Sequence, residues 1–321
     1  MSTATRERAA TEVHPSVAAL RAVGLIGSGK APAGAPRDLS RAHGVWAVTL
    51  EDVGDVVVKT APYTQDDDGP GTLGAELFVH RLALWCEPLR RVLPTPVVVD
   101  EAAMVLVTHE VVGPEPNAAF LADSDLAHRL GERTGRVHRA TAGLPVPPAP
   151  HPHVLAVVHE GTATGVAADL AGHPEVLAAA DELRRPAGGC LVHGDLKWSN
   201  LAVGADGPVV LDWELAGGGD PAWDVGSLAA EHLVRPGARA GLGPLLTGYA
   251  AGARPASRVL PAFSRRVALA AGLRVAQLAL EIASQELADV DALVRDVVDR
   301  AVGLVLDRAA LEREVWSWLA A

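Results

Sequence analysis

The sequence predicts an α+β, bilobal fold, with a small β-rich N-lobe over residues 1–112 and a larger, mainly helical C-lobe over residues 113–321. Strand-type runs concentrate in the first third of the chain, whereas helical periodicity dominates after Gly113 and Pro114. A short strand–loop–strand segment at 190–213 interrupts the helical part. We therefore expect a cleft between two lobes.

Each element of the N-lobe follows from a local pattern. Residues 14–28 have apolar positions at helical spacing and end near glycine, and 30–38 form a Pro/Gly loop. Two apolar runs joined by an acidic turn, 45–50 and 55–60, predict a β-hairpin. The remaining elements are a polar loop, a helix and two strands, at 62–74, 75–86, 96–99 and 103–108.

A GxxxxGK pattern at residues 24–30 matches the first part of a phosphate-binding P-loop, but the residues after it exclude that motif. A P-loop needs Ser or Thr next and a helix that begins at the lysine. Here Ala31 and Pro32 follow Lys30, and proline interrupts a helix at that point. We interpret the glycines as the end of the preceding helix.

The C-lobe is predicted from long stretches of helical periodicity. A Pro/His-rich loop at 145–153 separates the first of these helices from the others. The predicted helices cover 123–142, 175–184, 222–233, 242–252, 258–287 and, with breaks, 289–320.

Composition limits the possible functions. The chain has 321 residues, with 28 Lys plus Arg against 39 Asp plus Glu, and a formal charge of −11 with His neutral. Hydrophobic residues make up 49% and charged residues 21%, a balance that excludes disorder over most of the chain. The acidic balance argues against a nucleic-acid partner, whose phosphates need a basic surface. It suits a cationic substrate, or it only keeps the protein soluble.

The same sequence gives an expectation for the compartment. Cys86 and Cys190 are the only cysteines, which excludes a disulfide framework and a zinc knuckle. The first residues lack the apolar segment of a signal peptide, and no run approaches roughly 18 apolar residues. We expect a cytoplasmic protein that does not span a membrane.

The strongest chemical signal is the segment 190–200, CLVHGDLKWSN. An apolar strand leads into a loop that presents Asp195, Lys197 and Asn200 in quick succession. Phosphoryl transfer uses these residue types: a carboxylate orients or deprotonates the hydroxyl, a cation contacts the moving phosphate, and an amide oxygen binds Mg²⁺. Asp195 and Lys197 are therefore the candidate catalytic residues.

A second apolar strand, 209–213, carries Asp212 close to its end. A carboxylate at the end of a neighbouring strand completes a two-ligand magnesium site with Asn200, because Mg²⁺ takes few protein oxygens and keeps phosphate and water. Asn200 and Asp212 are the candidate metal ligands.

HGDLKWSN followed by VVLDWELAGGGDPAWDVGSL resembles the catalytic and metal loops of the aminoglycoside phosphotransferase and choline kinase-like family, which has the protein-kinase-like fold. The resemblance is most specific over 190–228 and extends over about 40–290. It implies a kinase that uses Mg²⁺ as cofactor and ATP or GTP as co-substrate.

The resemblance also assigns residues outside these loops. Lys59 matches the lysine that grips the α/β-phosphates, and Glu76 matches the glutamate that pairs with that lysine. Asp224 resembles the aspartate that braces the catalytic loop, and His193 is expected to anchor that loop by hydrogen bonds. A surface lysine and an ordinary carboxylate in the first turn of a helix remain the alternatives for Lys59 and Glu76.

The chain departs from the family pattern between the first two strands, where no GxGxxG occurs. Ser40, in the loop 38–46, is our candidate for lining the phosphates there. In the connector, Thr108, Glu110 and Val111 are expected to line the purine site and to offer backbone groups to it, as hinge segments do in this fold. No side chain in the connector distinguishes ATP from GTP.

Three functions follow from these observations. The first is transfer of the γ-phosphoryl group to a hydroxyl of a small molecule, such as an aminoglycoside or an amino alcohol. The second keeps the chemistry but takes Ser or Thr of a ribosomally made precursor peptide, with a separate lyase as partner. The third is a nucleotide-binding pseudokinase scaffold. The sequence does not determine the oligomeric state.

Acidic residues near the end of the long helix bear on the acceptor. Glu281, Glu286, Asp289 and Asp291 either face a cationic acceptor or form an ordinary solvated helix surface. Glu281 and Gln285 lie one turn apart and share a face.

Overall fold

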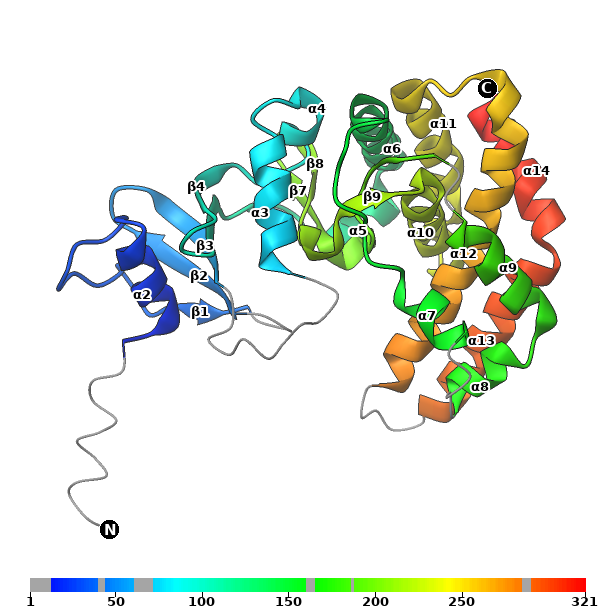
Figure 1. Ribbon diagram of the computed structural model, residues 1–321, viewed down its shortest axis with the longest axis horizontal. Coiled ribbons are helices and arrows are strands. Elements are labelled where there is room, and N and C mark those ends of the chain that lie inside the picture. The colour runs from blue at the N-terminus through cyan, green and yellow to red at the C-terminus, as the bar shows by residue number, and fades with distance from the viewer. Residues whose placement is uncertain (1–12, 40–43, 61–71, 160–164, 186–187, 285–289) are drawn as a thin grey trace, which may run out of the picture.

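The computed structural model describes residues 13–39, 44–60, 72–159, 165–185, 188–284 and 290–321. A small sheet lies at one end of the long axis and a larger group of helices at the other (Figure 1). The expected α+β, bilobal organisation is confirmed. Strand β5 ends at His109 and helix α5 begins at Pro116, so the boundary at residue 112 lies in the connector and stays a prediction.

The N-lobe contains one antiparallel sheet, which has five strands within the described residues, in the order β1-β2-β3-β5-β4. The predicted hairpin is formed by β2 and β3, whose register pairs Leu50 with Gly54 across the turn. The first strand is a two-residue edge strand within the segment that we predicted as a loop. The strands are β1 Arg37–Asp38, β2 Gly44–Leu50, β3 Gly54–Thr60, β4 Pro96–Asp100 and β5 Val105–His109.

Helices cover the apolar faces of this sheet. Helix α2 (Pro15–Ala22) buries Ala19 and Leu20 against the valines of β2, β3 and β5. It is shorter than the predicted 14–28. Helix α3 (Leu73–Leu82) begins at Thr72, whose hydroxyl accepts the Ala75 N–H at 3.3 Å, a normal helix cap. A short helix, α4 (Glu87–Arg90), follows.

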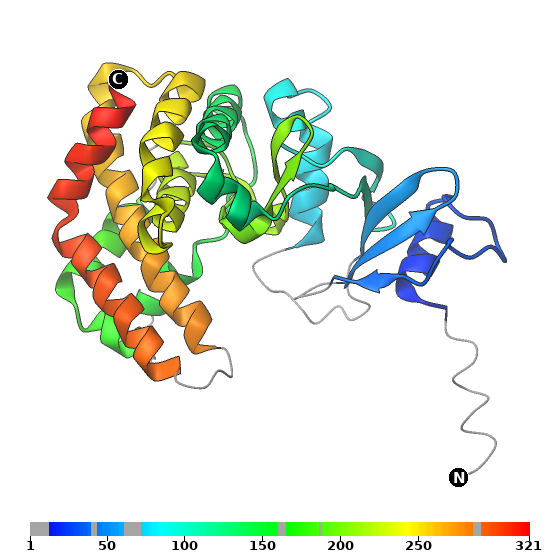
Figure 2. The same cartoon turned by 180° about the vertical axis from the view of Figure 1, so that it is seen from behind.

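The C-lobe is built around α12, a long helix whose residues from Arg266 to Gln277 are buried. Helices α9, α10, α13 and α14 pack against it, and α13 and α14 form the outer edge of the lobe (Figure 2). The helices are α5 Pro116–Ala122, α6 Ser124–Thr141, α7 His153–His159, α8 Val166–Ala171, α9 Pro174–Arg184, α10 Pro221–Val234, α11 Leu242–Ala253, α12 Leu260–Ala283, α13 Val290–Leu306 and α14 Arg308–Leu319.

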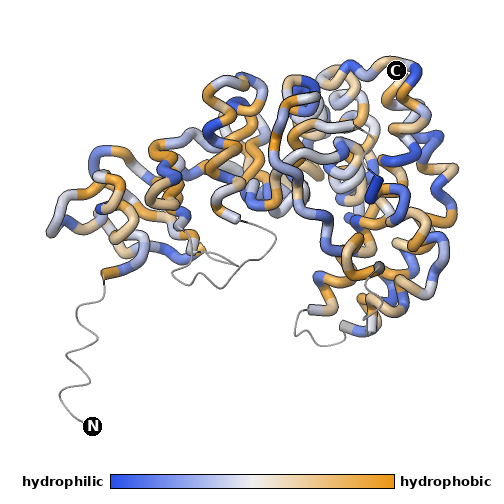
Figure 3. Tube along the Cα trace, viewed as in Figure 1, coloured by the Kyte–Doolittle hydropathy of each residue, from blue (hydrophilic) through white to orange (hydrophobic). Residues whose placement is uncertain are grey.

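Hydrophilic residues interrupt the apolar stretches of the helices along the whole trace (Figure 3). Within the described residues, none of the helices combines the length and the apolarity that a membrane span needs.

Helices α6 and α11 approach each other unusually closely through glycines. A Cβ atom on Gly131 would lie 2.0 Å from the Leu245 carbonyl oxygen, and one on Gly248 would lie 2.0 Å from the His128 carbonyl oxygen. Because such distances are below any van der Waals contact, only glycine allows this packing. The close approach also brings His138 of α6 to 3.2 Å from the Tyr249 hydroxyl of α11.

The segment between α9 and α10 differs from its prediction. We expected two neighbouring apolar strands, but the structure forms two separate ribbons. Strand β6 (Cys190–Val192) pairs with β9 (Gly217–Gly219), and β7 (Leu201–Gly204) pairs with β8 (Gly207–Val210). Strand β9 was not predicted from the sequence, because its three glycines have low strand propensity. Their small size is required, since a Cβ on Gly217 would lie 2.4 Å from the Ala149 nitrogen.

Candidate active site

The buried carboxylate of Asp224 holds the loop that follows β6 by hydrogen bonds to its backbone. Asp224, in the first turn of α10, accepts the backbone N–H groups of His193 and Gly194 at 2.8 and 3.1 Å. It also accepts the Nε2–H of His138 at 3.2 Å. Burial raises the pKa of Asp224, but the hydrogen bonds and charge of His138, together with those of His193, outweigh it and lower that pKa. Asp224 therefore stays ionised and holds the loop in place, as the resemblance implied.

His193 and Gly194 shape the beginning of this loop. His193 Nε2 lies 2.8 Å from the Leu211 carbonyl oxygen, and Nδ1 accepts the Asp195 N–H at 3.2 Å, which assigns the proton to Nε2. Gly194 has φ +86°, and a Cβ there would lie 2.6 Å from the Leu215 carbonyl oxygen. Only glycine permits this turn. His193 thus contacts backbone and not the pocket, in agreement with its expected role as an anchor.

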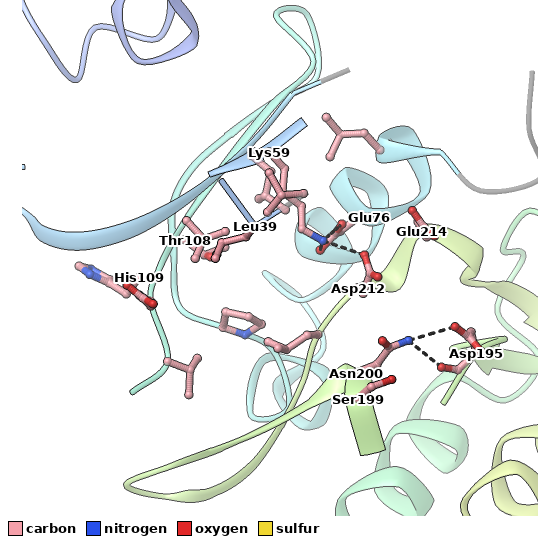
Figure 4. A pocket seen from close by; sticks show the side chains of 18 of the residues that line it. Leu39, Lys59, Glu76, Thr108, His109, Asp195, Ser199, Asn200, Asp212 and Glu214 are labelled. Atoms are coloured by element: carbon pink, nitrogen blue, oxygen red, sulfur yellow. Dashed lines mark hydrogen bonds and ion pairs between the residues drawn. The ribbon is translucent and has the colours of Figure 1, made fainter. Parts of the chain in front are cut away.

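Asp195 is held at one carboxylate oxygen and not at the other. Its Oδ2 lies 2.7 Å from Lys197 Nζ and accepts a hydrogen bond from Asn200 Nδ2 at 3.1 Å. Asn200 Nδ2 also donates to the Asp195 carbonyl oxygen at 2.9 Å (Figure 4). Oδ1 is buried and has no hydrogen-bond partner among the described residues. A buried carboxylate oxygen without a donor indicates a position for a donor from a ligand.

Lys59 joins the two lobes. Its ammonium group donates to both oxygens of Glu76, at 3.0 and 2.8 Å, and to Asp212 Oδ1 at 2.9 Å (Figure 4). The first contact lies within the N-lobe, between β3 and α3, and the second reaches the C-lobe. Burial lowers the pKa of Lys59, but the charges and hydrogen bonds of Glu76 and Asp212 outweigh it and raise that pKa to about 12. The lysine is therefore a permanent cation.

Asn200 and Asp212 lie on adjacent backbone segments. The Leu211 N–H donates to the Asn200 carbonyl oxygen at 2.8 Å, which ties the two segments together. Asp212 has φ 63° and ψ 60°, a left-handed conformation that Asp and Asn adopt more readily than other residues with a Cβ. In Figure 4 the Asn200 amide nitrogen faces Asp195 and its amide oxygen is turned away from it.

These two residues fit a hard divalent cation. An amide oxygen and a carboxylate are ligands that Mg²⁺ prefers, and Mg²⁺ takes its remaining ligands from phosphate and water. Among the described residues, no group of three or more His, Cys, Asp or Glu side chains could hold a metal ion. A metal at Asn200 and Asp212 therefore depends on the phosphates of a nucleotide.

One pocket of about 480 Å³ between the lobes is lined by Lys59, Glu76, Asp195, Lys197, Asn200 and Asp212. Thr108, Glu110 and Val111 line its far side, where the connector begins. The backbone N–H groups of His109 and Glu110 already donate to the carbonyl oxygens of Thr95 and Asp55, each at 2.9 Å. The structure brings together the predicted residues Lys59, Glu76, Thr108, Glu110, Val111, Asp195, Lys197, Asn200 and Asp212. Ser40 lies outside the described residues.

One supporting residue of the site escaped the sequence analysis. His138 donates a hydrogen bond to Asp224, but it lies in a helix whose pattern gives no sign of this contact. Both lysines that line the pocket, Lys59 and Lys197, were expected from the sequence.

Comparison with known proteins agrees with this geometry. A model of the phosphotransferase enzyme family matches residues 37–263, more than half of the chain. The chain belongs to this family. It is a phosphotransferase with a protein-kinase-like fold.

Solved structures share the fold of this phosphotransferase. An amicoumacin kinase in complex with AMP-PNP and Ca²⁺ has a TM-score of 0.65 and 17% identity, with 94% of this chain and 96% of that chain covered. A choline/ethanolamine kinase family protein from Mesorhizobium loti has a TM-score of 0.57 and 18% identity, with 95% and 99% covered. The aminoglycoside phosphotransferase APH(4)-Ia has a TM-score of 0.53 and 16% identity, with 88% of this chain and 94% of that chain covered. No curated protein sequence matches the chain.

Lys59 gives the first testable prediction for the phosphotransferase. Lys59→Met keeps the apolar stem but removes the charge-assisted contact with the phosphates that the family resemblance implies, and such a contact contributes roughly 1.5–3 kcal/mol. We expect kcat/KM to fall by at least about tenfold, since each 1.36 kcal/mol is a factor of about ten in rate. The matched control is Lys30→Met, because Lys30 is exposed and does not line the pocket. Equal kinetics in both variants would contradict a phosphate contact and leave Lys59 with a structural role only, as the cation between Glu76 and Asp212.

Asp224 gives a prediction about stability. Asp224→Asn places an amide where three buried donors meet a carboxylate, so at least one donor loses its partner. We expect the free energy of unfolding to fall by about 3–5 kcal/mol, as for a broken buried ion pair, and kcat to fall with it. Urea titration followed by circular dichroism measures this change. Asp299→Asn, on an exposed position of α13, is the control; a variant as stable as this control would contradict the role of Asp224.

Proposed function

We propose that this phosphotransferase moves the γ-phosphoryl group of ATP to a hydroxyl of a small molecule, with Asp195 as the residue that orients the hydroxyl and accepts its proton. The observation that carries the proposal is Asp195 Oδ1, which is buried, has no hydrogen-bond donor among the described residues, and lies in the same pocket as Lys59 and Asp212. A hydroxyl group supplies the missing donor.

The roles of the side chains follow from their contacts. The acceptor oxygen forms a bond to the γ-phosphorus, the bond from that phosphorus to the bridging β–γ oxygen breaks, and the hydroxyl proton passes to Asp195 late in the reaction. Asp195 is fixed for this by Lys197 and Asn200 at its other oxygen. Lys59, which Glu76 orients, is the cation that contacts the phosphates.

Asn200 and Asp212 would hold the divalent cation, which we propose to be Mg²⁺. When bound, such a cation neutralises negative charge on the phosphates. The two residues would fix the position of the cation relative to the catalytic loop, because Asn200 also contacts Asp195. We propose that the purine base occupies a site lined by Thr108, Glu110 and Val111.

The proposed acceptor is a small alcohol that carries an amine. The names of two comparison structures, an amicoumacin kinase and a choline/ethanolamine kinase family protein, support this choice of class. A scaffold without activity would not need a complete set of residues for phosphate, metal and hydroxyl contacts, and the residues that we propose for all three line the pocket.

An acceptor panel with γ-labelled ATP tests the proposal. The panel contains choline, ethanolamine, kanamycin and a Ser/Thr peptide, and mass spectrometry detects the gain of one phosphoryl group. We expect phosphorylation of at least one small alcohol and none of the peptide, with Asp195→Asn as the inactive control. Phosphorylation of the peptide alone would show that the acceptor is a peptide and not a small alcohol. Binding of ATP with no acceptor phosphorylated would contradict the proposal.

A further inference from the structure

The catalytic loop has a side that lines the pocket and a side that packs into the C-lobe. Four of its residues line the pocket: Asp195, Lys197, Ser199 and Asn200. Trp198 lies between them in the sequence but does not line the pocket. It is the largest of the fully buried side chains within the described residues. Trp198 therefore belongs to the packed side of the loop.

The indole ring of Trp198 is held by residues from two helices. Phe120 of α5 stacks on it, with ring centroids 5.5 Å apart and ring planes 23° apart. His232 of α10 meets it edge-on, with centroids 5.2 Å apart. The guanidinium carbon of Arg235, at the end of α10, lies 5.0 Å from the ring centroid, within the range of a cation–π contact. We call Phe120, Trp198, His232 and Arg235 the Trp198 cluster.

The partners of Trp198 are themselves fixed. Arg235 Nε donates to Glu231 Oε2 at 2.7 Å, and His232 Nδ1 donates to the Ala238 carbonyl oxygen at 2.8 Å. Trp198 Nε1, in contrast, is buried and has no hydrogen-bond partner among the described residues. A buried indole N–H usually has an acceptor, so this side chain acts through the area and the face of its ring and not through its N–H.

The backbone of Trp198 connects this packing to the site. Residues Trp198–Asn200 form a single 3₁₀ turn, in which the Asn200 N–H donates to the Lys197 carbonyl oxygen at 2.9 Å and the Leu201 N–H donates to the Trp198 carbonyl oxygen. So short a turn has few bonds of its own, and its position depends on what its side chains contact. A shift of Trp198 would therefore move Asn200 on one side and Lys197 on the other.

We propose that Trp198 is a positioning residue, which holds Asn200 in place for the divalent cation and Lys197 in place for Asp195. It acts from the packed side of the loop, through the Trp198 cluster. The inference rests on the proposed function, because that function assigns the cation to Asn200. The alternative is that Trp198 only stabilises the C-lobe.

The two roles differ in their effect on metal-dependent binding of nucleotide. Loss of stability lowers the unfolding temperature, but the molecules that stay folded bind as the wild type does. Loss of positioning weakens the cation site in folded molecules. Titration calorimetry with AMP-PNP, in excess Mg²⁺ and in EDTA, gives two Kd values. Their ratio measures how strongly the cation contributes to binding, and it requires neither an acceptor nor turnover.

For Trp198→Leu, we expect the ratio of the Kd values to fall by at least about fivefold and kcat by at least about tenfold, since a misplaced group loses much of its effect. The Kd in EDTA should stay within about twofold, because Lys59 is retained. Trp198→Phe should stay within about twofold of the wild type in all three values, since a phenyl ring keeps the stack on Phe120 and the face toward Arg235.

The control for lost stability is Leu311→Ala, at a buried position of α14 that does not line the pocket. It should lower the unfolding temperature and leave the ratio of the Kd values unchanged. Phe120→Leu protects the test from a folding defect in Trp198→Leu, because it changes only the ring that stacks on Trp198 and keeps an apolar side chain there. It should lower the ratio in the same direction, by at least about twofold.

An unchanged ratio in Trp198→Leu, or in Phe120→Leu where Trp198→Leu does not fold, would overturn the inference and leave the proposed function intact. A Trp198→Phe variant as impaired as Trp198→Leu would also overturn it, as would an equal loss of the ratio in Leu311→Ala. A wild type that binds AMP-PNP but phosphorylates no acceptor would contradict the proposed function, and the ratio of the Kd values would still decide the role of Trp198.

Discussion

Asp195→Asn is expected to lower kcat by about 10²–10⁴-fold, the usual contribution of a positioned acid or base. The asparagine keeps the size of the side chain and can still face Lys197 and Asn200, but it removes the charge and the proton acceptor. We expect the Kd for ATP to stay within about twofold, because in the proposed complex the phosphates contact Lys59 and the metal and not Asp195. Steady-state kinetics and nucleotide titration on one preparation give both values.

The control for this variant is Asp169→Asn, on an exposed position of α8. A kcat near that of the wild type would exclude Asp195 as the orienting residue. A parallel loss of ATP binding would instead place Asp195 in the metal site.

The second large effect is expected at Asp212. Asp212→Ala should abolish turnover, but alanine is also strained at φ 63°, so Asp212→Asn is the sharper variant. Asparagine tolerates this conformation and loses only the charge. We expect turnover below about one thousandth of the wild-type value, because a metal at the phosphates contributes several kcal/mol. ATP binding should weaken less than the rate.

Titration with Mg²⁺ at saturating ATP measures this effect directly. The apparent Mg²⁺ requirement should rise steeply in Asp212→Asn and stay unchanged in Asp206→Asn, on the exposed turn between β7 and β8. Wild-type turnover in Asp212→Asn would exclude Asp212 as a ligand. The same variant also removes a charge that Lys59 contacts, so the Lys59→Met variant should be tested beside it.

Local pattern predicted the parts of the fold that have strong periodicity. The hairpin of β2 and β3 and the helices α6, α9 and α12 fall within a few residues of their predicted ranges, because alternation and helical spacing are properties of short segments. The ion pair between Lys59 and Glu76 is different. Only the family resemblance joined these residues, which are 17 positions apart and lie on different elements.

Other parts of the site depend on contacts between distant segments and could not be predicted. Strand β9 consists of three glycines, and Gly217 must be glycine to fit beside Ala149, in a loop far earlier in the sequence. His138 supports Asp224 across 86 positions of sequence. The acidic residues at the end of α12 left two interpretations open, since the contact of Glu281 with Arg274 follows from packing alone. Asp291 is exposed on α13, and Glu286 and Asp289 lie outside the described residues.

The glycine contact between α6 and α11 has a consequence for how this enzyme tolerates substitution. Gly131 and Gly248 set the separation of these helices, and that separation sets the contact of His138 with Tyr249. His138 holds Asp224, which holds the loop of Asp195. Substitutions at these glycines should therefore impair the enzyme as strongly as substitutions in the catalytic loop, and natural selection should remove both. The exposed positions of α12 and α13 make no such contacts, and natural variants of this chain should differ freely there.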